Sequence, residues 1–272
     1  MTTLITEGGP VAADTTVTRI GGVPLAPPGT AWPSCADCGG PLQFLAQIVL
    51  DGSGAAVTGG PGQQDRLLVL FACQNRPGVC QDWEARSGAN LALVLPAQGL
   101  VPIPIPGPAD LDGGENEGED HDPDDPDEDE FEDDEDEFED DEDDEDEFED
   151  DEDDEDEFED DEDDEDEVLL LGATRAAEPQ HLPEAPDFDS ARAAWAARTG
   201  RPRNHVLGQL NGTPAWLQYD RTPSCATCAE PMRLAVQLQE GPDPLTAMNF
   251  GSGRAYAFTC SPCSDAAFLW QC

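Results

Sequence analysis

Short apolar runs of strand length, separated by Gly- and Pro-rich stretches, recur in both halves of the chain. There are three in each half, at 42–50, 66–72 and 89–96, and again at 232–240, 254–259 and 266–272. In each half the first two runs flank a Gly-rich loop, which predicts an antiparallel hairpin followed by a third strand. One stretch, 189–199, has a helical pattern, with Asp189 or Ser190 as the expected cap and Gly200 beyond its end. The pattern predicts an α+β protein that is mostly β.

The two halves are related to each other in sequence. Residues 210–240 lie over 20–50 without a gap after a shift of 190 positions, and nine of the 31 positions are identical. The identical pairs are Gly22/Gly212, Pro24/Pro214, Pro33/Pro223, Ser34/Ser224, Cys35/Cys225, Ala36/Ala226, Cys38/Cys228, Pro41/Pro231 and Gln47/Gln237. Such self-similarity predicts two pseudo-symmetric β-rich modules that arose by internal duplication.

Cysteines provide the candidate chemistry. Each expected module has two pairs, and the eight residues are Cys35, Cys38, Cys73, Cys80, Cys225, Cys228, Cys260 and Cys263. A CxxC turn directs two thiolates at one ion, and two such pairs complete a closed tetrahedral zinc site. Because one pair precedes the first strand of the hairpin and the other follows the second strand, antiparallel pairing brings four sulfurs together. We therefore predict up to two structural Zn²⁺ ions per chain.

Other interpretations of the cysteines remain open. They could be buried structural thiols without metal, above all in the first module, where six residues separate Cys73 from Cys80. A thioredoxin-like redox pair needs CxxC at the start of a helix, whereas a strand follows each CxxC pair here. Cys272 is left over. His121, His181 and His205 lack a nucleophile or metal-ligand spacing, so we expect no catalytic residues, no bound organic cofactor and no enzyme activity.

Charge is concentrated in one segment. Residues 110–167 contain 46 of the 62 acidic residues and no Lys or Arg, so the rest of the chain is close to neutral. This density of carboxylates predicts a disordered acidic linker between an N-terminal module, 1–109, and a C-terminal module, 168–272. Within it, Phe138, Phe148 and Phe158 recur every ten residues, either as relics of replication slippage or as apolar anchors for a basic partner.

Several classes of protein are not expected. No basic patch suggests contact with nucleic acid, and the first residues lack the charged leader and apolar stretch of a signal peptide. The apolar runs are too short to span a bilayer, so we expect no membrane partner. The chain is therefore expected to be a cytoplasmic monomer, and a reducing cytosol favours metal ligation over disulfides.

The segments around the CxxC pairs resemble a known family. Gly22-Val23-Pro24, Trp32-Pro33 and the residues from Cys35 to Gln47 resemble the bacterial YwqG-like family of unknown function. The later stretches TPAWLQ, PSCATCAEPMRLAVQL and NFGSGRAYAFTCSPC also resemble the C-terminal domain of the eukaryotic programmed cell death protein 2 family. The chain departs from the pattern at Ala229, where a Gly usually follows the second cysteine, and in its long acidic insertion.

The resemblance implies two pseudo-symmetric β-rich halves and no enzymatic activity. The eukaryotic members of the second family are dedicated chaperones for a newly made small-subunit ribosomal protein. Together with the acidic segment, whose charge would screen a positively charged client, this points to a basic client, with a ribosomal protein as one candidate. Two functions are therefore expected. One is a zinc-stabilised chaperone or escort for a basic client. The alternative is a generic protein-interaction module whose acidic tract is only a solubilising spacer.

Overall fold

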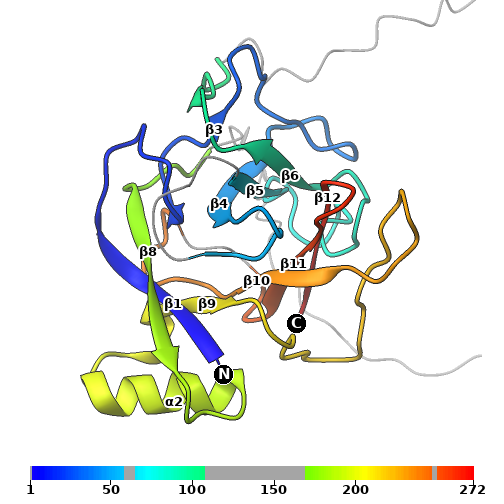
Figure 1. Ribbon diagram of the computed structural model, residues 1–272. Helices are drawn as coiled ribbons and strands as arrows, with labels where there is room; N and C mark the ends of the chain where they lie inside the picture. The colour runs from blue at the N-terminus through cyan, green and yellow to red at the C-terminus, as the bar shows by residue number, and fades with distance from the viewer. Residues whose placement is uncertain (1, 58–64, 108–168, 247–249) are drawn as a thin grey trace, which may run out of the picture. The chain divides into compact units, whose positions relative to one another are not determined.

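The computed structural model describes residues 2–57, 65–107, 169–246 and 250–272 (Figure 1). Described residues from both ends of the chain belong to one compact unit. The expected acidic linker, with its three phenylalanines and His121, lies outside the described residues. Within the described part, no helix is long and apolar enough to cross a membrane.

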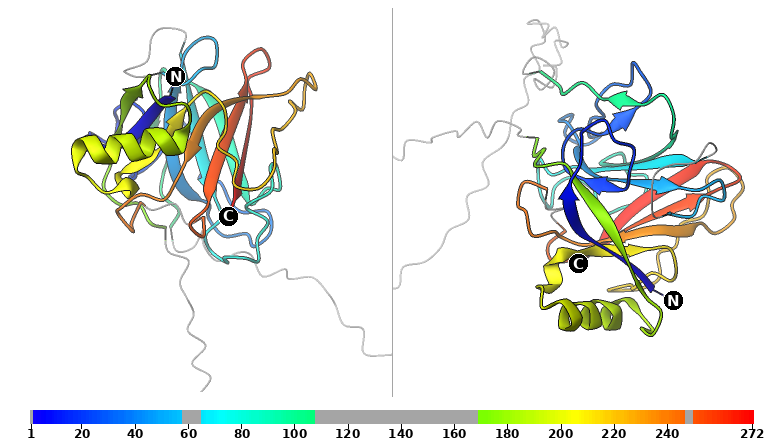
Figure 2. Two further views of the ribbon diagram at one scale, coloured as in Figure 1. Left: turned by 90° about the horizontal axis from the view of Figure 1, so that it is seen from below. Right: turned by 60° about the vertical axis from the view of Figure 1, so that its left-hand side comes forward.

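The fold is mostly β and is dominated by one antiparallel sheet of ten strands. Their order is β12-β11-β10-β9-β1-β8-β2-β4-β5-β6. The strands are β1 (Thr2–Pro10), β2 (Arg19–Ile20), β4 (Gln43–Leu50), β5 (Arg66–Ala72), β6 (Asn90–Pro96), β8 (Arg175–Leu182), β9 (Val206–Leu210), β10 (Arg233–Leu238), β11 (Arg254–Cys260) and β12 (Asp265–Gln271). The edge strands β6 and β12 approach each other, so the sheet is barrel-like and nearly closed (Figures 1 and 2).

The order of the strands shows how the two halves of the chain interlock. Strands β2, β4, β5 and β6 lie on one side of the central β1–β8 pair, and β9 to β12 lie on the other side. Strand β1 pairs with β9, where Thr3 is opposite Leu210, whereas β8 pairs with β2, where Arg175 is opposite Ile20. Each half therefore places its first strand beside strands of the other half: β1 lies beside β9 of the second half, and β8 lies beside β2 of the first half.

The six strands expected from apolar runs are all present, at nearly the expected positions. Successive side chains in these strands face two different hydrophobic cores, which explains why the runs are almost continuously apolar. In β5, Leu68 and Leu70 face the core inside the curved sheet, while Leu67, Val69 and Phe71 face a second core on its outer side. Both faces are buried, so consecutive positions are apolar.

The helix α2 (Phe188–Thr199) is inserted between β8 and β9 and packs against β1 (Figure 1). Its expected cap was wrong: the carboxylate of Asp187 accepts a hydrogen bond from the Ser190 backbone N–H at 2.8 Å. The helix ends as expected at Gly200, which has a left-handed φ of 71°. It is the only α-helix among the described residues. A 3-10 turn, η1 (Arg203–His205), follows it.

A second, two-stranded sheet was not expected. It pairs β3 (Leu25–Ala26) with β7 (Val101–Pro102), which is the beginning of the Pro-rich segment that follows β6. The side chains of Leu25 and Ala26 are fully buried and Ile103 is nearly so, and all three join the outer core of the first half. This small sheet covers the hydrophobic outer face of the β4–β5 hairpin.

Candidate metal centres

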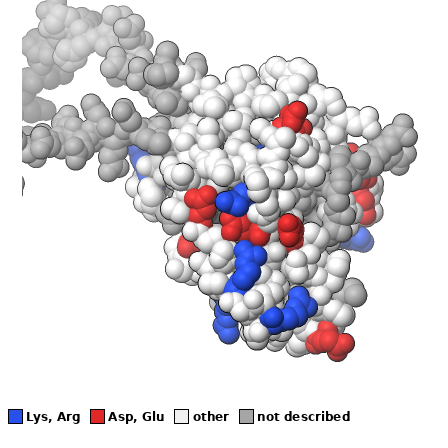
Figure 3. Space-filling model, turned by 90° about the vertical axis from the view of Figure 1, so that its left-hand side faces the viewer, with Lys and Arg blue, Asp and Glu red and all other residues white. Residues whose placement is uncertain are grey.

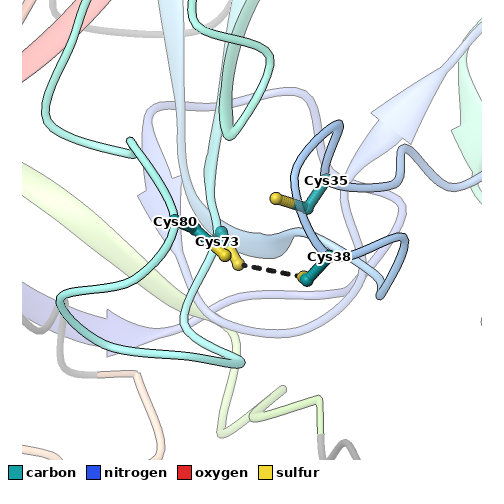
Figure 4. Close-up of side chains that lie close together, drawn as sticks. All are labelled: Cys35, Cys38, Cys73 and Cys80. Atoms are coloured by element: carbon teal, nitrogen blue, oxygen red, sulfur yellow. Dashed lines mark hydrogen bonds between the residues drawn. The ribbon is translucent and has the colours of Figure 1, made fainter. Parts of the chain in front are cut away.

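The structure brings the eight paired cysteines together in two groups of four. We call Cys35, Cys38, Cys73 and Cys80 the first cysteine cluster, and Cys225, Cys228, Cys260 and Cys263 the second cysteine cluster. In each cluster all four sulfur atoms lie within 4.8 Å of one another. Figure 4 shows the first cluster, in which the loop before β4 and the loop after β5 present their cysteines to a common centre.

The CxxC pairs sit on matching tight turns. In the first turn, the N–H of Cys35 donates to the carbonyl of Gly40 at 2.8 Å, and the N–H of Gly39 donates to the carbonyl of Cys35 at 2.9 Å. In the second turn, the N–H of Ala229 donates to the carbonyl of Cys225, also at 2.9 Å. Both turns require a left-handed residue at this position, with φ of 78° at Gly39 and 61° at Ala229. Glycine adopts this conformation without strain, whereas alanine does not.

The wide spacing of the later pair in the first cluster is closed by a local turn. The N–H groups of Val79 and Cys80 both donate to the carbonyl of Arg76, at 3.1 and 3.4 Å. The carboxylate of Asp37, within the CxxC turn, accepts the N–H of Gln81 at 2.7 Å and holds the two loops together. The long insertion therefore does not keep Cys80 away from the other three cysteines.

The distances between sulfurs suit a tetrahedral metal ion. Cys38 Sγ lies 3.7 Å from Cys73 Sγ, and Cys228 Sγ lies 3.7 Å from Cys260 Sγ. Four sulfurs at a zinc–sulfur distance of about 2.3 Å form a tetrahedron with edges of about 3.8 Å. Each cluster could therefore hold one metal ion, plausibly zinc. Four thiolates complete the coordination, so such a site has no open position for water or a substrate.

Hydrogen bonds to sulfur favour the thiolate form at one position in each cluster. The Asn75 side-chain amide donates to Cys38 Sγ, and the Thr227 backbone N–H donates to Cys225 Sγ, both at 3.4 Å. Burial opposes ionisation of Cys38, but its hydrogen bonds outweigh burial and lower its pKa. Hydrogen bonding from the backbone of the turn lowers the pKa of Cys225. Burial raises the pKa of Cys73 to about 12, so a cation is needed to ionise all four thiols.

One loop connects the two clusters. It follows Cys80 and precedes β6, and its Arg86 donates to Asp265 at 2.8 Å, at the start of β12. The same Asp265 carboxylate accepts the backbone N–H of Ala226, inside the CxxC turn of the second cluster, at 2.9 Å. In the other direction, the carbonyl of Gly88 accepts the N–H of Ala36 in the first cluster. The spacing of the cysteines carried no signal of this connection.

The two described histidines belong to neither cluster. Nδ1 of His181 lies 3.1 Å from the hydroxyl of Thr3, and Nδ1 of His205 lies 3.1 Å from a carboxylate oxygen of Glu7. Both contacts join strands or turns that are distant in the sequence.

No protein-family profile matches the chain. A segment of 66 residues, 24% of the chain, is 35% identical to the uncharacterized protein YpfL of Salmonella typhimurium. The match spans only 15% of that protein's length, and its name states no activity.

Proposed function

We propose that this chain is a zinc-stabilised protein-binding protein that escorts a basic client, with one structural Zn²⁺ in each cysteine cluster. The closed four-sulfur sets carry the proposal, because they can stabilise the loops around the sheet but offer no coordination position for catalysis. The resemblance to the YwqG-like and programmed cell death protein 2 families supports a chaperone-like role. It makes a ribosomal protein one candidate client.

The internal duplication also supports a role in binding another polypeptide. Nine identities over 31 positions relate the halves, and the strands β2, β4, β5 and β6 occur in the same spatial order as β9, β10, β11 and β12 on the other side of β1 and β8. We infer that one zinc-knuckle module was copied and that the copies now share a sheet. Two related halves offer two related surfaces for contacts with another polypeptide.

The distribution of charge supports a basic client. The 46 acidic residues between 110 and 167 are unbalanced by any Lys or Arg, whereas the rest of the chain has 16 acidic residues and 12 Arg. On the face of the described body in Figure 3, acidic and basic side chains are interspersed and most of the surface is uncharged. The acidic segment would therefore supply long-range attraction, and the body would supply selectivity.

Metal analysis tests the structural part of this proposal. The purified chain should contain two zinc ions, and Cys225→Ser and Cys35→Ser should each remove one. Cys272→Ser is the matched control, because this exposed cysteine lies outside both clusters. Since structural zinc contributes about 10 kcal/mol or more to folding, a chelator should lower the melting temperature by many degrees. A chain that contains no metal after gentle purification, with all nine thiols reactive, would refute the zinc sites.

Aggregation of a client tests the functional part. A purified basic ribosomal protein diluted from denaturant should stay soluble with the intact chain at 0.15 M salt, and an acidic protein of similar size should gain nothing. Deletion of 110–167 should weaken this protection, as should 1 M salt, where the screening length falls from about 8 Å to about 3 Å. Replacement of Phe138, Phe148 and Phe158 by Ser tests whether they are apolar anchors. If they are, the replacement should weaken the binding that survives high salt; if they are relics of replication slippage, it should change nothing.

The outcomes separate the two candidate functions. If the deletion leaves both the protection and its salt dependence unchanged, the acidic tract is a spacer and the generic interaction module is correct. If the intact chain does not protect any basic protein, the escort function is wrong, whatever its zinc content.

A further inference from the structure

The first half of the chain contains a groove that is filled by the chain itself. The segment 169–172, just before β8, continues that strand alongside the residues that follow β2. Leu170 is bound at both backbone groups by the side-chain amide of Gln43, whose Oε1 accepts the Leu170 N–H at 2.9 Å. The carbonyl of Leu171 accepts the N–H of Gly22. The three leucines of the segment are half-buried, so an extended aliphatic peptide is bound here through its backbone.

The duplicated half contains the corresponding groove, and there it is open. The positions 190 residues later are Gly212, which matches Gly22, and Arg233, which matches Gln43. Gly22 is half-buried and Gln43 is buried, whereas Gly212 and Arg233 are both exposed. A cavity of about 840 Å³ lies between them. Its apolar lining includes Pro214, Met232, Leu234, Phe258 and Pro262.

The walls of the two grooves also correspond. Each is bordered by the hairpin loop of the opposite half. In the filled groove, a Cβ placed on Gly21 or on Gly172 would collide with Thr246, in the loop between β10 and β11. In the open groove, residues 53–55, in the loop between β4 and β5, form the border. The side chain of Asn211 holds that loop by bonding to both backbone groups of Ala56 at 2.9 Å.

The three internal stretches between the described ranges lack the aliphatic composition of the segment that fills the first groove. The residues outside the described ranges that could reach it would need an aliphatic run such as the three leucines at 169–171. The sequences 58–64 and 247–249 have no Leu, Ile or Val, and 108–168 has only Leu111 and Val168, which are 57 positions apart. None of these three stretches therefore matches the aliphatic segment that fills the first groove.

We propose that the open groove beside the second cysteine cluster binds an extended aliphatic segment of a partner polypeptide. The proposal rests on the function proposed above, for which it names a binding site. The N–H of Gly212 would donate to a backbone carbonyl of the segment, as the N–H of Gly22 does to Leu171. Arg233 can only donate hydrogen bonds, so it would bind a carbonyl or carboxylate oxygen, whereas the amide of Gln43 both donates and accepts. Apolar side chains of the segment would cover the lining around Leu234.

The chain's own sequence supplies the probe. A fluorescent peptide with the sequence of residues 168–174, Val-Leu-Leu-Leu-Gly-Ala-Thr, is titrated with the full-length zinc-loaded protein and followed by anisotropy. Saturable binding is expected, and a peptide with three serines in place of the leucines should not bind. Thr213→Trp, at an exposed position of the groove lining, should weaken binding at least tenfold. Arg233→Gln should tighten it several-fold, because it recreates the amide that binds Leu170.

Arg198→Gln is the matched control, because Arg198 is exposed on α2 and does not line this groove; it should leave binding unchanged. Unchanged zinc content and melting temperature show that a variant is folded. Absence of binding, or binding that Thr213→Trp and Arg233→Gln both leave unchanged, would overturn the proposal. So would a concentration-dependent dimer that Thr213→Trp abolishes, because the occupant would then be a second copy of this chain.

Failure of the groove can be told apart from failure of the proposed function. If the Thr213→Trp variant protects a basic client as well as the unmodified chain does, the escort function stands and the groove is not its client site. If the variant loses both the peptide and the client, the groove is the place where the partner binds.

Discussion

Exchange of the left-handed residue after each CxxC pair should change stability in opposite directions in the two clusters. The turns have the same hydrogen bond and similar φ, but one contains Gly39 and the other Ala229. We predict that Ala229→Gly stabilises the protein and that Gly39→Ala destabilises it. A Cβ at Gly39 would meet no atom within 4 Å, so only the backbone conformation determines the second effect.

The magnitude follows from two opposing terms. A left-handed conformation costs an L-residue about 1–2 kcal/mol. Glycine recovers this cost, but it also gains about 0.4–1 kcal/mol of conformational freedom in the unfolded chain. Ala229→Gly should therefore raise the free energy of unfolding by about 0.5–1 kcal/mol, and Gly39→Ala should lower it by a similar amount. For a body of roughly 200 residues, this corresponds to about 1–4 °C in melting temperature.

Two assays check this prediction. Calorimetry of the zinc-loaded variants gives the melting temperatures, and competition with a chromophoric chelator gives the zinc affinity of each cluster. The affinity of the second cluster should rise about two- to fivefold in Ala229→Gly, since 1.4 kcal/mol corresponds to a factor of ten. If Ala229→Gly lowers the melting temperature, or if neither variant changes it, the strain assigned to this turn is absent.

Three further changes test the body of the fold. Burial raises the pKa of Asp82 to about 6. The folded state therefore binds this proton more tightly than the unfolded chain does. Its stability should fall as the pH rises from about 4 to 6. Asp82→Asn should therefore be more stable than the unmodified chain by about 1–3 kcal/mol at pH 7, and urea denaturation should show about half that difference at pH 5. The ion pair between Arg86 and Asp265 should show a coupling energy of about 0.5–1 kcal/mol in a double-mutant cycle, and additive single changes would exclude it. Gly208→Ala should lower the free energy of unfolding by about 3 kcal/mol or more, because φ is 153° and the added Cβ would lie 1.8 Å from a backbone carbonyl oxygen. Gly9→Ala is the control, because nothing lies within 4 Å of a Cβ at that position. Equal melting temperatures of the two variants would contradict the close approach at Gly208.

The hairpins and the convergence of their cysteines could be predicted because their signals are local. Apolar runs such as 66–72 have strand length, and a Gly-rich loop between two runs leaves the hairpin as the simplest pairing. The position of a cysteine pair at the open end of a hairpin then determines which sulfurs can meet. Even the Cys73–Cys80 spacing was compatible, since a single turn at Arg76 closes it.

The central strands had no such signal. Strand β8 contains Glu178, Pro179 and Gln180, and β2 has only two residues, so neither has the alternation of an independent strand. They form because their backbone groups pair with strands that are far away along the chain, as in the pairing of Thr3 with His181. Burial of the sheet then requires these hydrogen bonds to be made.

The sequence by itself determined the mostly β class, the helix before Gly200, the relation between the halves and the two groups of four cysteines. The fold class, the helix and the cysteine groups follow from residue types at spacings within one hairpin or one helix, and the relation between the halves follows from direct comparison of their sequences. Only the tertiary structure decided that the halves exchange their first strands, that the loop with Arg86 joins the two clusters, and that 169–172 fills one groove while its counterpart at Gly212 stays open. These features depend on contacts between residues more than 100 positions apart. Bringing such residues together costs chain entropy, which only the complete set of neighbouring contacts offsets. No local sequence pattern encodes these contacts.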